Sequence, residues 1–436
     1  MLTFLFFALV FVLVLGILVL GHELGHFWAA RWNGIKVEEF GFGYPPRLFG
    51  IQLFKKNKLE KIGEKEEITI ETGENSSGEM VEKITDKISE IDVVVPSKKW
   101  RLVWGAKAIK KLEEENKGQD GTVYSINLLP FGGFCKIKGE EGGANDPDSY
   151  DAKKPWQKAI VMAGGVIMNI LLAAVLLSIG FIIGLPQNVE NVSDVSNIKN
   201  RKLEIMSVLP GKPAEISGLK EGDVIVILGT LTNPRQKEMI AYVDAHKKEK
   251  ISISVMRGEE LIVKSIQPII YPDTGKGGIG VAIAEVGTVQ YPWYKAIYYG
   301  FITTFIYLKA ILFAFFYLFK GLFSGAGVGD AVTGPIGIAV MTGRVARMGL
   351  VYLIQFTAVL SLNLAIVNAL PLPALDGGKV LFLLIGKLRG RPVSQKIENA
   401  IHIIGFNLLI LLAIIITVKD VSAFKGVFSN LFHKIF

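Results

Sequence analysis

The chain has 436 residues, of which 50% are hydrophobic and 20% charged, and its formal net charge is +8. This is more apolar than an ordinary soluble protein of this length, so a membrane protein is the first expectation. The basic residues are spread over the polar segments and no nucleic-acid motif is present, which favours attraction to anionic lipid over nucleic-acid binding. The single cysteine, Cys135, excludes an internal disulfide and a cysteine-based zinc site.

Residues 1–33 predict a first transmembrane helix. Residues 2–20 carry no charge, and about twenty residues at about 1.5 Å each cross the hydrocarbon core of a bilayer. A cleaved signal peptide is the alternative, but the segment has neither a basic start nor a small-residue cleavage pattern. The segment continues instead into GILVLGHELGHFWAARW, from Gly16 to Trp32.

This stretch carries a candidate metal site. His22 and His26 are four residues apart, which in a helix offsets them by about 40°, so both imidazoles face the same way. Glu23 lies beside them, and the HExxH pattern supplies two metal ligands and a general base for metal-assisted hydrolysis. Two polar residues at a helix end are the alternative, but charge near the membrane interior is costly and tends to be functional.

The next segments alternate between polar and apolar. Residues 34–155 are polar and mixed, and we expect them to lie on one side of the membrane. The stretch of about 52–119 is dense in charge, which indicates a solvated and partly flexible insertion. Residues 156–185 predict a second transmembrane helix, in which Gly164 and Gly165 allow close helix packing.

Residues 190–289 predict a separate domain of short strands and turns. The stretch SVLPGKPAEISGLKEGDVIVILG, from Ser207 to Gly229, looks like a PDZ domain of the bacterial protease type. KISISVMRGEELIVKSIQP alternates as a hairpin around Arg257 and Gly258. The length allows a single PDZ domain, and an unrelated small β domain is the alternative.

The last third of the chain is largely apolar. Residues 293–346 contain lysines and tyrosines that suit interfacial or re-entrant helices, followed by a GPIGI segment. Residues 347–378 and 379–436 each add a transmembrane helix, the second with a C-terminal tail. We therefore expect a polytopic α-helical membrane protein with about four core transmembrane helices, a membrane-associated β segment and one PDZ domain.

A catalytic zinc site takes three protein ligands, so a third ligand is needed. His246 and His433 lie in polar segments, and His402 begins the last apolar run. The better candidate is Asp376 in NALPLPALDGG, where prolines prevent a regular helix and glycines permit an unusual backbone. An irregular backbone at membrane depth is tolerated only where it is buried in protein or lines a cavity.

HExxH in the first membrane helix and NxxPxPxLDG in a late one resemble the site-2 protease family of intramembrane zinc metalloproteases, peptidase family M50. The resemblance covers most of the chain and is to the single-PDZ, regulator-of-sigma-E protease type, which clips anti-sigma factors and remnant signal peptides. It implies one zinc ion per chain, bound by His22, His26 and Asp376, with Glu23 as catalytic base.

The resemblance also implies substrate contacts. Asn368 and Asn363 would bind substrate backbone, because amides can pair with the N–H and C=O groups of an unwound helix. EFGFGYPPRLFG and YSINLLPFGGFCKIKGE are similar to family strands that dip into the membrane, where an edge strand can add a substrate strand. From these strands we expect contacts by Gly132, Gly133 and Phe134, with a plain surface hairpin as the alternative.

Two features depart from the family. The link between the two β segments is much longer than usual, and Val166 stands where the family often has the proline of an AGP sequence. The first departure leaves the role of the insertion open. The second concerns the local shape of the helix rather than the chemistry.

Because the zinc ligands must converge, the helix ends that carry His22 and Asp376 should lie on one face of the membrane. Helix 156–185 then leads to the opposite face and to the PDZ domain. By the same parity, residues 294–323 should lie in the interface or dip in and return. The resemblance assigns the first face to the cytosolic side of the bacterial cytoplasmic (inner) membrane, with an extracytoplasmic PDZ domain.

We expect an intramembrane zinc metalloprotease that hydrolyses transmembrane segments of pre-trimmed single-pass membrane proteins. The PDZ domain would exclude substrates with a large external portion, or bind a peptide ligand. One alternative is a catalytically inactive PDZ membrane scaffold, which the intact Glu23 and the three candidate ligands argue against. The other is an ion-handling transporter, which the lack of internal repeats argues against. Membrane lipid is an expected partner and nucleic acid is not.

Overall fold

The computed structural model describes most of the chain, namely residues 2–74, 80–104, 121–140, 142, 146–189, 198–258, 260–272, 275–324 and 333–423. Residues 75–79 and 105–119 of the predicted insertion and the tail with His433 lie outside the described residues. The chain divides into two compact units, one of residues 1–10, 170–364 and 413–436, the other of residues 11–169 and 365–412.

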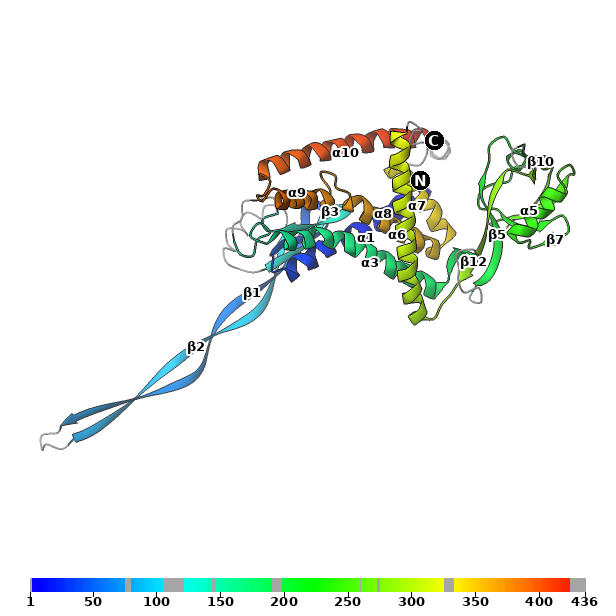
Figure 1. Ribbon diagram of the computed structural model, residues 1–436. Coiled ribbons are helices and arrows are strands. Elements are labelled where there is room, and N and C mark those ends of the chain that lie inside the picture. Colours follow the sequence, from blue (N-terminus) through cyan, green and yellow to red (C-terminus); the bar gives the residue numbers. More distant parts are fainter. Residues whose placement is uncertain are drawn as a thin grey trace. The chain divides into compact units, whose positions relative to one another are not determined.

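Long helices make up much of the structure (Figure 1). Within the described residues, five are long and apolar enough to cross a membrane. These are α1 (Leu2–Trp32), α3 (Pro155–Ile183), α6 (Trp293–Phe323), α8 (Leu350–Ala369) and α10 (Gln395–Ala423). The shorter helices are α4 (Pro213–Ile216), α5 (Gln236–Ala245), α7 (Pro335–Met348) and α9 (Asp376–Leu388). The chain therefore has the helices of a multi-pass membrane protein.

Helix α6 is the additional candidate span beyond the four that we expected. It is one continuous helix of 31 residues, which favours an interfacial placement of residues 294–323 over a re-entrant one. Its Ala296 packs in one buried cluster with Ala173 and Leu177 of α3. The interfacial placement stays a prediction.

The GPIGI segment forms the start of α7. The backbone N–H groups of Gly334 and Gly337 donate to the carboxylate of Asp420 on α10, at 3.2 and 2.7 Å. A Cβ atom at Gly334 would lie 2.8 Å from that carboxylate. The glycine therefore lets a buried acid satisfy the free N–H groups at a helix start.

The first sheet has the order β2-β1-β3, from β1 (Val37–Glu74), β2 (Met80–Trp104) and β3 (Gly121–Ile137). Strands β1 and β2 pair antiparallel from Phe49 with Trp104 to Glu74 with Met80. The described part of the predicted insertion is therefore a long twisted hairpin (Figure 1). At its base, residues 39–42 of β1 pair on one side with residues 133–136 of β3 and on the other with residues 123–126.

A buried polar group fixes this base. The guanidinium of Arg47 pairs with the carboxylate of Glu39, and the Ser125 hydroxyl donates to the same carboxylate at 2.6 Å. All three side chains are buried. A buried charge that is both paired and hydrogen-bonded is tolerated, so this group holds the folded-back β1 against β3.

The second sheet has the order β4-β12-β5-β6-β8-β9, with β7 paired to β6. Its strands are β4 (Leu185–Asn188), β5 (Ile198–Val208), β6 (Val224–Leu228), β7 (Leu231–Thr232), β8 (Ile251–Arg257), β9 (Glu260–Ile266) and β12 (Val281–Val289). A separate pair joins β10 (Ile269–Ile270) and β11 (Gly277–Gly278). Helix α5 contributes Met239 and Val243 to the buried core of this domain.

The fully buried Asp223 of this domain accepts two hydrogen bonds from Arg257, at 2.7 and 2.8 Å.

Candidate metal centre

Three side chains from distant parts of the chain converge in the second unit. His22 Nε2 lies 3.0 Å from Asp376 Oδ2, His26 Nε2 lies 3.3 Å from the same oxygen, and the two Nε2 atoms lie 3.1 Å apart. Around a tetrahedral zinc ion with bonds of about 2.0–2.1 Å, neighbouring ligand atoms are about 3.3 Å apart. The three atoms therefore have the spacing of three corners of a zinc site, and they could hold that ion.

Helix α3 orients both imidazoles. The Nδ1–H of His26 can donate to the carbonyl oxygen of Val161 at 2.8 Å, which leaves the lone pair of Nε2 toward Asp376. The side-chain amide of the fully buried Asn169 lies 3.2 Å from Nδ1 of His22. Partners on the second ring nitrogen fix the tautomer and direction of a metal-binding histidine. Neither of these two partners was predicted from the sequence.

Glycines allow helix α3 to pack closely against helix α1. A Cβ atom on Gly25 would lie 2.2 Å from the carbonyl oxygen of Gly164, so the two backbones touch. A Cβ atom on Gly165 would lie 2.5 Å from His22 Cε1 and 2.6 Å from His26 Nε2. The small residues thus allow the close packing that the sequence predicted, and one of them lies directly against both imidazoles.

Asp376 is the first residue of α9, after an irregular loop. A Cβ atom on Gly377 or Gly378 would lie 2.2 Å from a carbonyl oxygen of that loop, so both positions require glycine. Oδ2 of Asp376 is buried and has no hydrogen-bond partner among the described residues, although it lies 3.0 and 3.3 Å from the two imidazole Nε2 atoms. A carboxylate oxygen with a free lone pair in this position could bind a metal.

The alternative third ligand lies elsewhere. His402 is not in the metal group, and its Nδ1 accepts a hydrogen bond from the backbone N–H of Ala374 at 2.8 Å. Nearby, the Nζ atom of Lys379 on α9 lies 2.5 Å from Glu140 Oε1. Neither contact was expected, because each joins segments that are far apart in the sequence.

Strand β3 passes beside Glu23. A Cβ atom on Gly133 would lie 3.9 Å from Glu23 Cγ, and one on Gly132 would lie 3.1 Å from Val19 of α1. Gly132 also has φ of +76°, which favours glycine. The ring of Phe134 instead covers Gly41, whose added Cβ would lie 2.4 Å from it. The glycines thus bring the strand to the helix, while Phe134 packs on the sheet.

The two candidate asparagines of α8 differ. Asn368 Nδ2 lies 3.3 Å from His22 Nε2, beside the metal group. Asn363 Nδ2 donates to the carbonyl oxygen of Val359 at 2.9 Å, within its own helix. Five residues turn an α-helix by about 140°, so the two amides point in different directions. The structure therefore brings Asn368 to the site and gives Asn363 an ordinary helix contact.

An apolar cavity of about 350 Å³ adjoins Asp376. It lies between α3, α9 and the end of α8. Its walls include Met162, Val166 and Ile167 of α3 and Val380 and Leu384 of α9. Val166 thus lines a space large enough for an apolar side chain.

Comparisons with known proteins identify the family of the chain. The model of peptidase family M50 matches residues 10–60 and 107–412. The regulator of sigma-W protease RasP of Bacillus subtilis is 30% identical over 443 residues, which cover 95% of this chain and 98% of that protein. The zinc metalloprotease RasP of Geobacillus kaustophilus is 29% identical over 443 residues, which cover 95% of this chain and 97% of that protein.

One solved structure concerns the β domain alone. The PDZ domain of the SdrC-like protein of Listeria monocytogenes is 23% identical, covers 19% of this chain and 85% of that one, and has a TM-score of 0.18, which does not establish a shared fold. The family model matches most of the chain and contradicts the transporter alternative. The chain belongs to peptidase family M50, the site-2 protease family of zinc metalloproteases.

Proposed function

We propose that the protein is an intramembrane protease that cleaves transmembrane segments of single-pass membrane proteins. In this proposal His22, His26 and Asp376 hold zinc and Glu23 is the catalytic base. One observation supports the assignment above all: three ligand atoms lie at tetrahedral spacing, two of them on a helix apolar enough to cross a membrane. The name of the Bacillus subtilis relative, regulator of sigma-W protease, supports a substrate that takes part in the regulation of a sigma factor.

The residues around the site divide the work of hydrolysis. Zinc, when bound, supplies a Lewis acid that lowers the pKa of a water molecule and polarises a carbonyl group. Glu23 takes the proton of the attacking water and passes it to the leaving amide nitrogen. Asn368, beside His22, can pair with a backbone group of an opened substrate helix.

Strand β3 offers a place for the opened substrate. Residues 133–136 pair with β1 along one edge, and no strand of the described residues pairs with the other edge. An extended segment can add to such an edge through backbone hydrogen bonds. Gly133 lies beside Glu23, so a strand added here would run past the proposed base. The apolar cavity next to Asp376 would take a substrate side chain.

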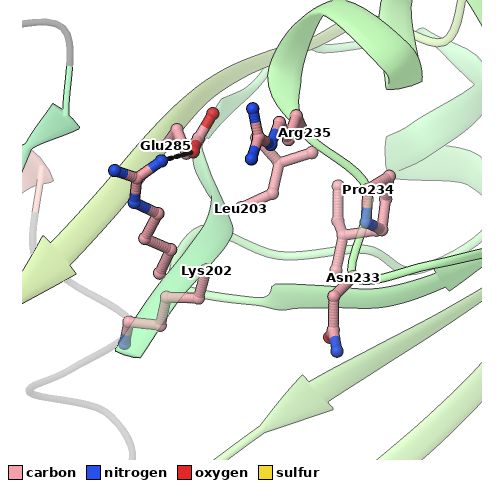
Figure 2. Close-up of a pocket in the computed structure, with 8 residues that line it drawn as sticks. Lys202, Leu203, Asn233, Pro234, Arg235 and Glu285 are labelled. Atoms are coloured by element: carbon pink, nitrogen blue, oxygen red, sulfur yellow. Dashed lines mark ion pairs between the residues drawn. The ribbon is translucent and has the colours of Figure 1, made fainter. Parts of the chain in front are cut away.

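We propose that the β domain is a PDZ domain outside the cytoplasmic membrane that filters substrates by size, with the active site near the cytosolic side. A second role is favoured by a pocket of about 220 Å³, which Figure 2 shows. Arg201 and Arg235 line this pocket. The ion pair between Arg201 and Glu285 is long, at 3.9 Å. Such a pocket could take an acidic side chain of a peptide ligand.

The first experiment compares detergent-purified wild type with Glu23→Gln on a single-span reporter trimmed outside the membrane. We expect the variant to keep zinc at one per chain and to lose at least about a hundredfold in cleavage, because general base catalysis is typically worth that much. Glu249→Gln, at an exposed acid of the β domain, is the matched control and should cleave the trimmed reporter normally. Equal cleavage by all three proteins would exclude Glu23 as the base. Zinc without cleavage by the wild type would favour the scaffold alternative.

A further inference from the structure

The loop that carries Asp376 contains a residue in a strained conformation. Ala374 has φ of +72°, a left-handed conformation that residues with a Cβ rarely adopt. The other non-glycine residues with positive φ in the described part of the chain are both asparagines, which tolerate this conformation. Alanine has no polar side chain to compensate. A contact from outside the loop must therefore hold Ala374 in place.

Helix α10 makes that contact. The backbone N–H of Ala374 donates to His402 Nδ1 at 2.8 Å. One turn further along α10, a Cβ atom on Gly405 would lie 2.4 Å from Pro373 Cβ and 3.0 Å from its carbonyl oxygen. Residues three apart lie on the same face of a helix. One face of α10 thus touches two consecutive residues of the loop.

The important property of His402 is the hydrogen-bond acceptor at Nδ1 and not the size of its ring. Phe382 of α9 packs against it, with ring centroids 5.5 Å apart. Because Nδ1 accepts, the proton of the neutral ring is on Nε2. That nitrogen is buried and has no hydrogen-bond partner among the described residues. An apolar side chain would avoid this cost, so the acceptor at Nδ1 is the property that this position uses.

The loop in turn sets the position of a proposed metal ligand. Asp376 follows Ala374 by two residues, and its Oδ2 must stay within 3.0 and 3.3 Å of the two imidazoles. We propose that His402 is a positioning residue, which acts through Ala374 to hold the carboxylate of Asp376 at the metal centre. This inference rests on the proposed function, because it takes the site to bind zinc.

The test uses substitutions that keep or move the acceptor. Asparagine places its Oδ1 where histidine has Nδ1, whereas glutamine places its oxygen near the position of Nε2. We would measure the zinc affinity of the full chain in detergent by competition with a chelator. We expect His402→Gln and His402→Ala to weaken zinc binding by about 10–100-fold, the usual effect of losing such a partner. The zinc affinity of His402→Asn should stay within about threefold of that of the wild type.

Asn407→Ala is the matched control, since Asn407 is on the same helix and donates only within it. Asparagine rescue separates positioning from packing, because a role in packing alone would be lost equally in all three variants. Wild-type zinc affinity in His402→Gln and His402→Ala, or equal loss in His402→Asn, would overturn the inference. A wild-type protein that binds no zinc would instead overturn the proposed function.

Discussion

At the scale of single residues, the metal centre depends on a glycine as well as on its ligands. Gly165 lies where any side chain would meet both imidazoles, at 2.5 Å from His22 and 2.6 Å from His26. Ordinary contact distances are about 3.5–4.0 Å, so both rings, or helix α3 itself, would have to move by about 1 Å. We expect Gly165→Ala to weaken zinc binding at least about tenfold and to slow cleavage accordingly.

Chelator competition measures this effect, with Val175→Ala as the control because Val175 is an exposed position on the same helix. The expected loss is specific to zinc, so helix content by circular dichroism should not change. A Gly165→Ala protein that binds zinc as tightly as the wild type would show that the rings have room to shift.

Some of these residues could be predicted from the sequence and others could not, for a physical reason. His22 and His26 could be paired from sequence because four-residue spacing is a local property of a helix. Asp376 stood out because prolines and glycines surround it. Asn169 and His402 act through contacts between helices, and local periodicity does not specify which helices meet. His402 drew attention only as a possible ligand, whereas the structure places it against the backbone of Ala374.

At the scale of elements, the hairpin of β1 and β2 shows how composition can hide secondary structure. Its charge density predicted a solvated insertion, and the structure shows paired strands instead. A half-buried strand is predicted from apolar residues at alternate positions, and this segment has too few such residues to predict a strand along its whole length. Helix α6 shows the converse. Residues 293–323 contain no proline, and the structure shows one continuous helix there, where the sequence had left interfacial and re-entrant placements open.

The hairpin also leads to a prediction. Its outer part pairs only with itself among the described strands, and the family model leaves residues 61–106 unmatched. We expect a protein in which Asn-Gly replaces residues 56–97, joining the paired Lys55 and Lys98, to keep zinc and to cleave the reporter within about twofold of the wild type. Leu53 and Phe54 are kept because they also pair with β3. Normal zinc content with lost cleavage would instead assign the hairpin a part in substrate binding.

At the scale of the whole molecule, a membrane protease must combine a water-consuming reaction with an apolar substrate. The proposed metal centre lies near the end of the apolar helix α1, beside a β sheet and a loop rather than in the middle of a span. Polar groups and water are cheapest near the membrane interface, and an opened substrate can be satisfied there by an edge strand. The size of the substrate outside the membrane must then be controlled by another part of the chain.

The β domain is suited to that control, and its removal tests the idea. The domain has its own buried core around Leu203, Ile205 and Ile253, so deleting residues 197–283 should leave the metal centre intact. We expect the shortened protein to cleave a reporter that still carries a folded external domain. The wild type should not cleave this untrimmed reporter. Both proteins should cleave the trimmed reporter at similar rates.

The filter works only if the β domain lies on the same side of the membrane as the external part of the substrate, so the experiment also tests the proposed topology. If the untrimmed reporter stays resistant to the shortened protein, exclusion by size is wrong. If the trimmed reporter is cleaved more slowly, the domain recruits substrates, and Arg235→Gln in the full chain should then reproduce that slowing through the pocket of Figure 2. Faster cleavage of untrimmed substrate with an unchanged rate on the trimmed one would therefore separate a steric filter from a peptide-binding module.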